Sequence, residues 1–206
     1  MKKSRDDVQL IKHEVVAKSY FQLDRYTLRH RLYNDDWSPD ITRDVFERGN
    51  AAAVVLYDPD LDIIVLVEQF RPGVYAAGDE KPWTLEIVAG IVEPDEDIDA
   101  LVRREAEEEA NLIISDLMEI PGIYSTSGGC SEYFWLFCGR VDASNAGGVY
   151  GKDDEGEDIR VVVMDRTEVM SALEDGRIQA GFTVVALQWL ALNLDRVRAT
   201  FAQSEA

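Results

Sequence analysis

The chain has 206 residues, and its 40 acidic and 21 basic side chains give a formal net charge of −19. This charge argues against general nucleic-acid binding, which requires a surface rich in lysine and arginine. No apolar run approaches about 18 residues, and the basic start lacks an apolar segment, so we expect neither a membrane span nor a secretion signal. Cys130 and Cys138 are expected to be free and buried, as is usual in the cytoplasm.

The hydrophobic pattern predicts an α/β protein with a strand-rich N-terminal part. Two or three strands are expected within residues 12–48. The later strands are expected at Ala51–Tyr57, Asp62–Phe70, Trp83–Val92 with a break at Gly90, Met118–Tyr124, Tyr133–Val141 and Ile159–Met164. Helices are expected in the middle of Gly90–Ile113, at Arg166–Gly176 and at Thr183–Phe201, and loops at Arg71–Pro82 and Ser144–Asp158. We therefore predict a central sheet between helices over residues 49–206, preceded by a strand-rich subdomain over residues 1–48.

The first of these helices carries an unusual number of carboxylates. At about 100° per residue, three of them fall on or beside the apolar face, and these are Glu105, Glu108 and Glu109. Unpaired carboxylates near a core cost several kcal/mol or take up protons, and Arg103 and Arg104 compensate only in part. Divalent cations such as Mg²⁺ or Mn²⁺ prefer carboxylate oxygens, so a metal site is one interpretation. A solvated acidic helix face is the plainer alternative.

The spacing of this segment decides between the two interpretations. Gly90 is followed after five residues by Glu96 and after seven more by Arg104-Glu105, and the segment ends at Leu112. It resembles the Nudix box, which reads G-x5-E-x7-R-E-U-x-E-E-x-G-U, where U is a bulky or apolar residue. Asn111 stands where the family has glycine, and asparagine also suits a left-handed helix end. The chain is therefore identified as a member of the Nudix hydrolase family.

Further segments resemble the bacterial ADP-ribose pyrophosphatase branch of that family. They are Phe46–Pro59, Glu68–Arg71, Pro82–Gly90, Ser127–Glu132, Glu155–Val161 and Ala186–Leu190. The resemblance implies a Nudix α/β/α sandwich with a mixed sheet and an N-terminal strand-rich subdomain. It also implies a homodimer that exchanges N-terminal strands and shares its active sites. The expected reaction is hydrolysis of ADP-ribose to AMP and ribose 5-phosphate with two to three Mg²⁺ ions, or Mn²⁺ in their place.

The same resemblance assigns roles to individual residues. The expected metal ligands are the main-chain carbonyl of Ala89 and the side chains of Glu105, Glu108, Glu109 and Glu157. The expected catalytic residues are Glu155, Glu157, Glu105 and Glu109, with Glu155 favoured as the base and Glu157 as a metal or water ligand. The expected substrate-binding residues are Tyr20, Arg43, Arg71 and Glu132. Arg104 is expected to orient a box carboxylate and Glu96 to be structural, whereas Glu86 is either a substrate contact or a buried partner of an arginine.

Three other functions compete with this one. The first is an enzyme that cleaves other nucleoside-diphosphate sugars, such as GDP-mannose. The second is a sensor that binds ADP-ribose without cleaving it. The third is an acidic scaffold with no site. The complete set of box carboxylates and the lack of a basic helix-turn-helix segment disfavour a sensor, and the box spacing disfavours a scaffold. The sequence does not choose between Mg²⁺ and Mn²⁺ or between the two phosphorus atoms.

Overall fold

The computed structural model describes residues 3–152 and 156–203. The chain forms two compact units. The first comprises residues 1–50 together with 124–133, and the second comprises residues 51–123 and 134–206. Within the described ranges, no helix has both the length and the apolar character needed to cross a bilayer.

The first unit is built on an antiparallel sheet in the order β1-β2-β3. After a short 3₁₀ helix, Arg5–Asp7, the strands are β1 (Val8–Lys18), β2 (Gln22–His30) and β3 (Ile41–Glu47). The connection between β8 and β9 joins this sheet, because Phe46 N donates to Gly129 O at 2.8 Å and Ser131 N donates to Phe46 O at 3.3 Å. The predicted strand-rich N-terminal part is thus present, with three strands.

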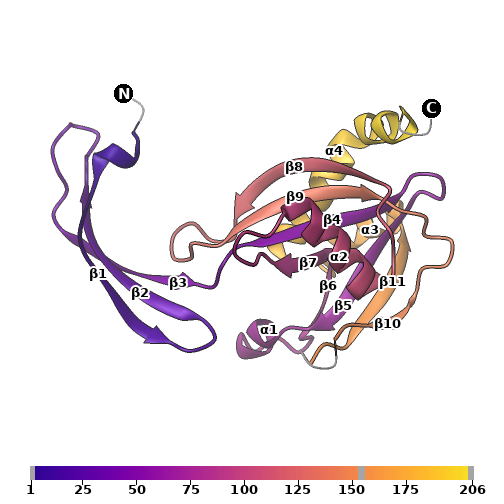
Figure 1. Cartoon of the computed structure of the whole chain (residues 1–206), viewed down its shortest axis with the longest axis horizontal. Helices are drawn as coiled ribbons and strands as arrows, with labels where there is room; N and C mark the ends of the chain where they lie inside the picture. Colours follow the sequence, from indigo (N-terminus) through magenta and orange to yellow (C-terminus); the bar gives the residue numbers. More distant parts are fainter. Residues whose placement is uncertain (1–2, 153–155, 204–206) are drawn as a thin grey trace. The chain divides into compact units, whose positions relative to one another are not determined.

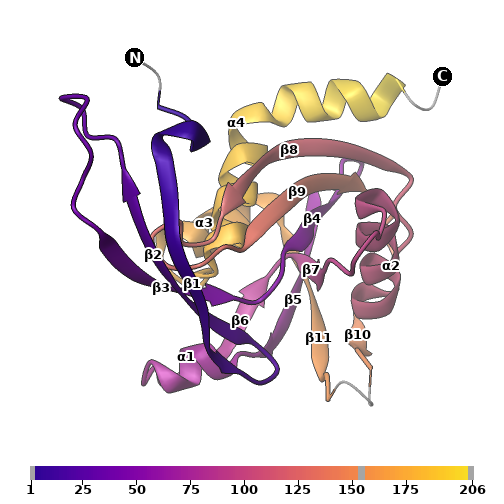
Figure 2. The ribbon, with the colours of Figure 1, turned by 60° about the vertical axis from the view of Figure 1, so that its left-hand side comes forward.

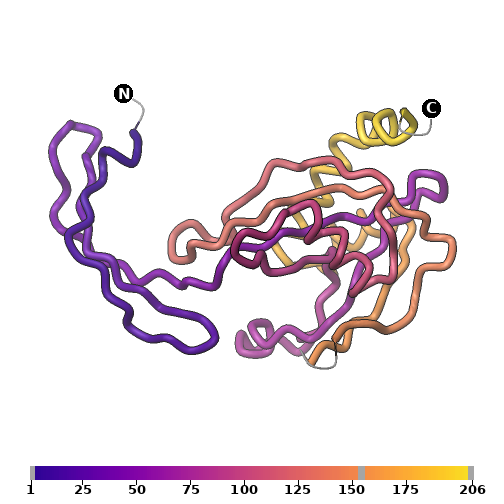
Figure 3. The backbone as a smooth tube through the Cα atoms, viewed as in Figure 1, coloured from indigo at the N-terminus to yellow at the C-terminus, as the bar shows by residue number. Residues whose placement is uncertain are grey.

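The second unit contains a mixed sheet in the order β10-β11-β5-β4-β9-β8. Its strands are β4 (Ala51–Asp58), β5 (Ile63–Phe70), β6 (Trp83–Glu86), β7 (Val88–Ile91), β8 (Asp116–Tyr124), β9 (Tyr133–Arg140), β10 (Gly148–Tyr150) and β11 (Ile159–Asp165). β4 runs parallel to β9 and antiparallel to β5 and β7, which makes the sheet mixed. β6 pairs with β5, and Figure 3 traces the path of the chain through these strands.

Helices cover both faces of this sheet (Figure 1). All eight residues of β4 are buried, which explains its continuous apolar sequence. Ala53, Val55 and Tyr57 share one core cluster with residues of α3 (Arg166–Glu174) and α4 (Gly181–Gln203). The alternate residues of β4 share the other cluster with α2 (Ile98–Ala110), and Figure 2 shows α2 apart from α3 and α4. The predicted α/β/α sandwich is confirmed.

Three local predictions are wrong. The strand predicted over Trp83–Val92 is divided at Ile87, not at Gly90, since β6 pairs with β5 and β7 with β4. At this change of partner, Ile87 N donates to the hydroxyl of Thr183 on α4 at 3.1 Å. The predicted loop after Arg71 contains the short helix α1 (Pro72–Ala76), with proline in the first turn. The predicted loop over residues 144–158 contains β10, which pairs with β11.

Candidate active site on the acidic helix

The acidic helix α2 has well-defined ends. At its start, the side chain of Asp97 accepts a hydrogen bond from Ala100 N at 2.9 Å. At its end, Asn111 adopts φ 53° and ψ 40°, and Leu112 N donates to Ala106 O at 3.1 Å. The expected left-handed end is thus formed with asparagine in place of the family's glycine. These two caps fix where the helix begins and ends.

The carboxylates of α2 lie at the border between core and solvent. The apolar face of the helix packs against the sheet through Leu101, Val102, Ala106 and Ala110. Beside it, the side chain of Glu105 is 15% exposed and that of Glu108 is 29% exposed. Glu109 is buried, at 3% exposure, whereas Glu107 points to solvent. The helical projection of the sequence is confirmed for all four glutamates.

Gly90 allows α2 to approach the sheet closely at β7. A Cβ atom at this position would overlap the Glu105 carboxylate. The backbone of Gly90 does not have a positive φ, so the glycine is required for space and not for conformation. The adjacent backbone of Ala89 forms a hydrogen bond with Glu109, which acts to lower the pKa of that carboxyl. The main chain of β7 and the carboxylates of α2 therefore form one wall of oxygen-rich surface.

Two cationic side chains neutralise the outer part of this wall. Arg104 lies 3.1 Å from Glu96, 2.9 Å from Glu105 and 2.7 Å from Glu108. The Nζ of Lys152 lies 2.9 Å from Oε2 of Glu108. Burial by itself would raise the pKa of Glu108, but the hydrogen bonds from Lys152 and Arg104 hold that pKa below its ordinary value. The expected pairing of Arg104 with box carboxylates is present.

Glu109 is the exception, because its Oε2 is buried and has no hydrogen-bond partner. Burial, followed by repulsion from Glu105 and Glu157, raises the pKa of Glu109 to about 8, although Arg71 acts in the opposite direction. A buried carboxylate oxygen without a donor fits a hard cation, which favours oxygen ligands. In the described ranges, no three acidic, histidine or cysteine side chains converge on one point. Glu105 and Glu108 would have to turn from Arg104 and Lys152 to complete such a set.

Arg71 lies next to this acidic wall and is held by Glu86. Its Nη2 donates to Glu86 at 2.6 Å, and its Nε is 3.1 Å from both carboxylate oxygens. Burial would lower the pKa of Arg71, but Glu86, and then Glu109 and Glu157, raise it. Glu86 is buried at 3% exposure, so of the two interpretations left open for it, the structure has the acid paired with an arginine. The pairing orients the guanidinium without removing it from solvent, since the side chain is 38% exposed.

The loop between β10 and β11 brings Glu157 to the same region. Its carboxylate accepts a hydrogen bond from Lys152 N at 3.1 Å, and its own N–H donates to Lys152 O at 3.1 Å. Repulsion from Glu157 contributes to the raised pKa of Glu109. Glu155, the predicted base, lies outside the described residues.

Residues 47–183, which contain this helix and loop, match the profile of the NUDIX domain. The chain belongs to the Nudix family. A protein named ADP-ribose pyrophosphatase from Escherichia coli K12 is 42% identical over 189 residues, covering 92% of this chain and 90% of that protein. Another with this name, from Haemophilus influenzae Rd, is 34% identical over 203 residues, covering 98% of this chain and 94% of that protein.

Two further proteins are similar to this chain, one by sequence and one by structure. A protein named GDP-mannose pyrophosphatase from Citrobacter koseri is 32% identical over 186 residues, covering 89% of this chain and 94% of that protein. A solved structure described as an ADP compounds hydrolase superposes with a TM-score of 0.67 and covers 92% of this chain and 97% of that chain. Its sequence identity is 21%, so it supports the Nudix fold alone.

The remaining predicted substrate residues belong to the first unit. Tyr20 lies in the turn between β1 and β2, is 82% exposed and meets Phe21 edge to face. Arg43 lies on β3 and donates to Thr42 O at 2.7 Å. Glu132 is buried at 4% exposure and lies 3.1 Å from Nε of Arg48. The structure brings Ala89, Glu105, Glu108, Glu109, Glu157 and Arg71 together in the second unit, whereas Tyr20, Arg43 and Glu132 stand in the first.

Sequence reasoning missed Lys152 and Arg48. Lys152 is the one basic residue in the acidic segment 144–158, and this was the available signal. Nothing in the spacing of the chain indicates that it would meet Glu108, which is 44 positions earlier, because the pairing depends on how β10 and β11 join the sheet. Arg48 likewise meets Glu132 only through the attachment of residues 124–133 to the first unit.

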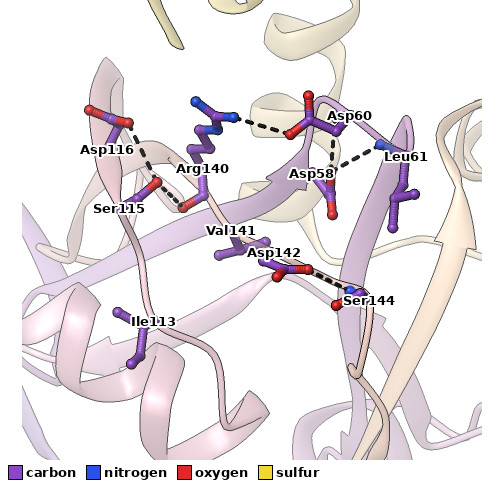
Figure 4. Close-up of a pocket in the computed structure, with 10 residues that line it drawn as sticks. All are labelled: Asp58, Asp60, Leu61, Ile113, Ser115, Asp116, Arg140, Val141, Asp142 and Ser144. Atoms are coloured by element: carbon purple, nitrogen blue, oxygen red, sulfur yellow. Dashed lines mark hydrogen bonds and ion pairs between the residues drawn. The ribbon is translucent and has the colours of Figure 1, made fainter. Parts of the chain in front are cut away.

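A separate cavity of about 710 Å³ lies elsewhere in the second unit, between the β4–β5 turn and the ends of β8 and β9 (Figure 4). None of the predicted site residues lines it. Its acids are engaged by donors of the chain itself. Asp60 pairs with Arg140 at 3.1 Å, and Asp58 accepts from Leu61 N at 3.0 Å. These contacts support a structural role for the acids, namely fixing the ends of the strands.

The raised pKa of Glu109 predicts how stability depends on pH when divalent ions are removed by a chelator. The folded state keeps this proton up to about pH 8, whereas the unfolded state loses it near the ordinary value of 4.5. The folded state therefore binds more protons between these values, and its stability falls as the pH rises through that window. The contribution is at most about 1.4 kcal/mol per pH unit.

Urea unfolding at pH 5, 6, 7 and 8 in EDTA measures this effect. Glu109→Gln should be more stable than the wild type at pH 8 and should lose the contribution of this residue to the slope. Glu107→Gln, which removes an exposed charge one position away, should keep the wild-type slope. Equal slopes for the wild type and Glu109→Gln would contradict the prediction.

Proposed function

We propose that this chain is an ADP-ribose diphosphatase, which cleaves the pyrophosphate of ADP-ribose with water to give AMP and ribose 5-phosphate. The observation that carries the proposal is the unpartnered, buried Oε2 of Glu109 within a Nudix box whose carboxylates are all present. The identity of 42% to a protein named ADP-ribose pyrophosphatase supports this choice of substrate. In the reaction, the oxygen of water bonds to one phosphorus while the bridging P–O bond breaks.

The proposal assigns the carboxylates and the arginines different roles. Two to three Mg²⁺ ions, or Mn²⁺ in their place, would be held by Glu105, Glu108, Glu109, Glu157 and the carbonyl of Ala89. When bound, such ions supply activation of water and neutralisation of phosphate charge. Arg104 orients the outer carboxylates through its ion pairs with them. Arg71, oriented by Glu86, presents its remaining donors to an oxygen of the pyrophosphate or to the terminal ribose.

Deprotonation of the attacking water is assigned to the loop between β10 and β11. Glu155 is proposed as the base and Glu157 as a ligand of metal or water. Support for a role of this loop comes from Glu157, whose charge acts on Glu109 and on Arg71. An acid that interacts with both is suitably placed to influence water near the phosphate.

The first unit is proposed to serve dimerisation and substrate binding. Every residue of β1 is exposed within one chain, including five aliphatic side chains, Val8, Leu10, Ile11, Val15 and Val16. A strand with so much uncovered apolar surface favours association with a second copy. We propose a homodimer that exchanges its N-terminal strands and shares its active sites. Tyr20 and Arg43 would hold the adenine, and Glu132 would contact a ribose.

A second candidate substrate is favoured by one comparison. Proteins named GDP-mannose pyrophosphatase are also similar over most of the chain, at 32% identity for the one from Citrobacter koseri. The metal-binding carboxylates would serve either substrate, since the pyrophosphate is common to both. A small-molecule substrate in the cytoplasm, without a nucleic-acid or membrane partner, agrees with the net charge of −19 and with two unpaired, buried cysteines.

Incubation of the purified chain with ADP-ribose and Mg²⁺ should release AMP and ribose 5-phosphate, whereas GDP-mannose should be cleaved more slowly. Chromatography of the released nucleotide distinguishes the two, and ¹⁸O-labelled water identifies the attacked phosphorus. Glu105→Gln should lower the rate by about a hundredfold or more, because it removes a ligand charge at the site. Faster cleavage of GDP-mannose would favour the second candidate, and binding of ADP-ribose without cleavage would favour a sensor.

Removal of either loop carboxylate should reduce the chemical step. Glu155→Gln and Glu157→Gln should each lower kcat by ~10²–10⁴ if they assist proton transfer. Glu119→Gln is a suitable control, because it removes an exposed carboxylate from β8. If both loop variants stay within a few-fold of the wild-type kcat, the loop has no part in the mechanism.

Light scattering should give the mass of two chains for the wild type at micromolar concentration. A double variant, Leu10→Glu with Val15→Glu, should yield a monomer, because it places charge on the exposed apolar side chains of β1. Circular dichroism would check that the variant folds. A monomeric wild type would remove the shared active site from the proposal.

A further inference from the structure

Lys152 makes an unusual pair of contacts. Its ammonium lies 2.9 Å from Oε2 of Glu108 on α2. Its main chain forms two hydrogen bonds with Glu157, one from Lys152 N to the carboxylate at 3.1 Å and one from Glu157 N to Lys152 O at 3.1 Å. One residue therefore contacts two of the carboxylates that the proposed function assigns to metal binding. It reaches the first with its side chain and the second with its backbone.

The conformation of the loop supports the backbone part of this arrangement. Gly151, which precedes Lys152, has φ 106°, a region that favours glycine. A Cβ atom on Gly151 would also press against the Cβ of Glu157. The chain thus turns tightly enough at Gly151 to place the main chain of Lys152 against Glu157.

The charge distribution explains why an ammonium binds there. Oε2 of Glu108 receives Arg104 at 2.7 Å as well as Lys152 at 2.9 Å. Arg104 is shared among three carboxylates, so it neutralises none of them fully. Lysine carries a compact charge on a flexible stem and lacks the planar fork that makes arginine pairs geometrically specific. Of the two cations at Glu108, Lys152 is the one that can leave at lower cost.

We infer that Lys152 is an internal cation that competes with a divalent ion for Glu108, while its main chain holds Glu157 in the loop. This inference rests on the proposed function, since it requires Glu108 to belong to the metal set. Lys152 is a positioning residue and has no assigned contact with the substrate. A divalent ion that takes Oε2 of Glu108 has to displace the ammonium, whereas the main chain of Lys152 can keep its hydrogen bonds with Glu157.

Mn²⁺ binding measured by electron paramagnetic resonance provides the main test. Lys152→Met should bind Mn²⁺ roughly three- to tenfold more tightly than the wild type, because the competing charge is gone. Lys152→Arg, which keeps the charge, should not bind more tightly than the wild type. Lys81→Met is the matched control, because it removes an exposed lysine that lies before β6. Its affinity should stay within about twofold of the wild type.

The salt dependence separates competition from a merely structural role. The ratio of the Lys152→Met and wild-type affinities should shrink towards one in 1 M KCl, where the Debye length falls to about 3 Å. If Lys152 only supports the loop that carries Glu157, Lys152→Met should instead bind Mn²⁺ more weakly. Weaker or unchanged binding by this variant would overturn the inference.

Amine labelling followed by mass spectrometry tests the displacement directly in the wild-type protein. Reductive methylation of Lys152 should accelerate as Mn²⁺ saturates the site, whereas that of Lys81 should not. An unchanged rate at Lys152 in protein that has bound Mn²⁺ would also overturn the inference. Assays of the same wild-type protein distinguish failure of this inference from failure of the proposed function. If it binds Mn²⁺ and hydrolyses ADP-ribose, only the role of Lys152 is lost, and if it does neither, the proposed function fails as well.

Discussion

The structure of the candidate site depends on one constraint, which is that a helix rich in glutamate must also contribute to a hydrophobic core. α2 packs Leu101 and Ala106 against the sheet and has Glu109 buried beside them. The ionised form of an acid at this position costs several kcal/mol, so the pKa of Glu109 is raised to about 8 and the folded state keeps the proton below that pH. The rest of the second unit is densely packed, with β4 buried on both faces. The sandwich therefore stabilises a helix that its local electrostatics would disfavour.

Much of the fold could be predicted because its main elements have clear periodicity and end signals. The apolar runs of β4 and β5 indicated strands covered on both faces, and β4 is buried throughout while β5 is buried over most of its length. The left-handed end of α2 at Asn111 followed from a single residue type. The division at Ile87 could not be predicted, since it reflects which neighbour each half of the segment pairs with. Such choices depend on contacts between positions that are distant in the sequence.

The candidate site divides in the same way. The box places its carboxylates on one short helix, so their relative positions follow from helical geometry and could be derived without the structure. The groups that pair with them come from other elements. Arg71 is fixed by Glu86 across the pair β5 and β6, and Lys152 reaches Glu108 from the connection between β10 and β11. The sequence indicated that Arg71 was of interest and left Glu86 as one possible partner of an arginine, but it did not show that the two pair.

These partners explain how an acidic protein can be suited to an anionic substrate. The wall of α2 and β7 has more carboxylates than Arg104, Lys152 and Arg71 neutralise. Burial, together with this excess, raises the pKa of Glu109, whose Oε2 is reached by no donor. A site with a deficit of positive charge attracts small hard cations, and these in turn attract phosphate oxygens. Arg71 and Arg104 each make more than one contact with carboxylates, and these contacts hold the arginines and their acidic partners in place. Lys152 also contributes positive charge, but its ammonium can be displaced by a divalent cation. The site is therefore partly neutralised without the ion, and its carboxylates still become available when the ion binds.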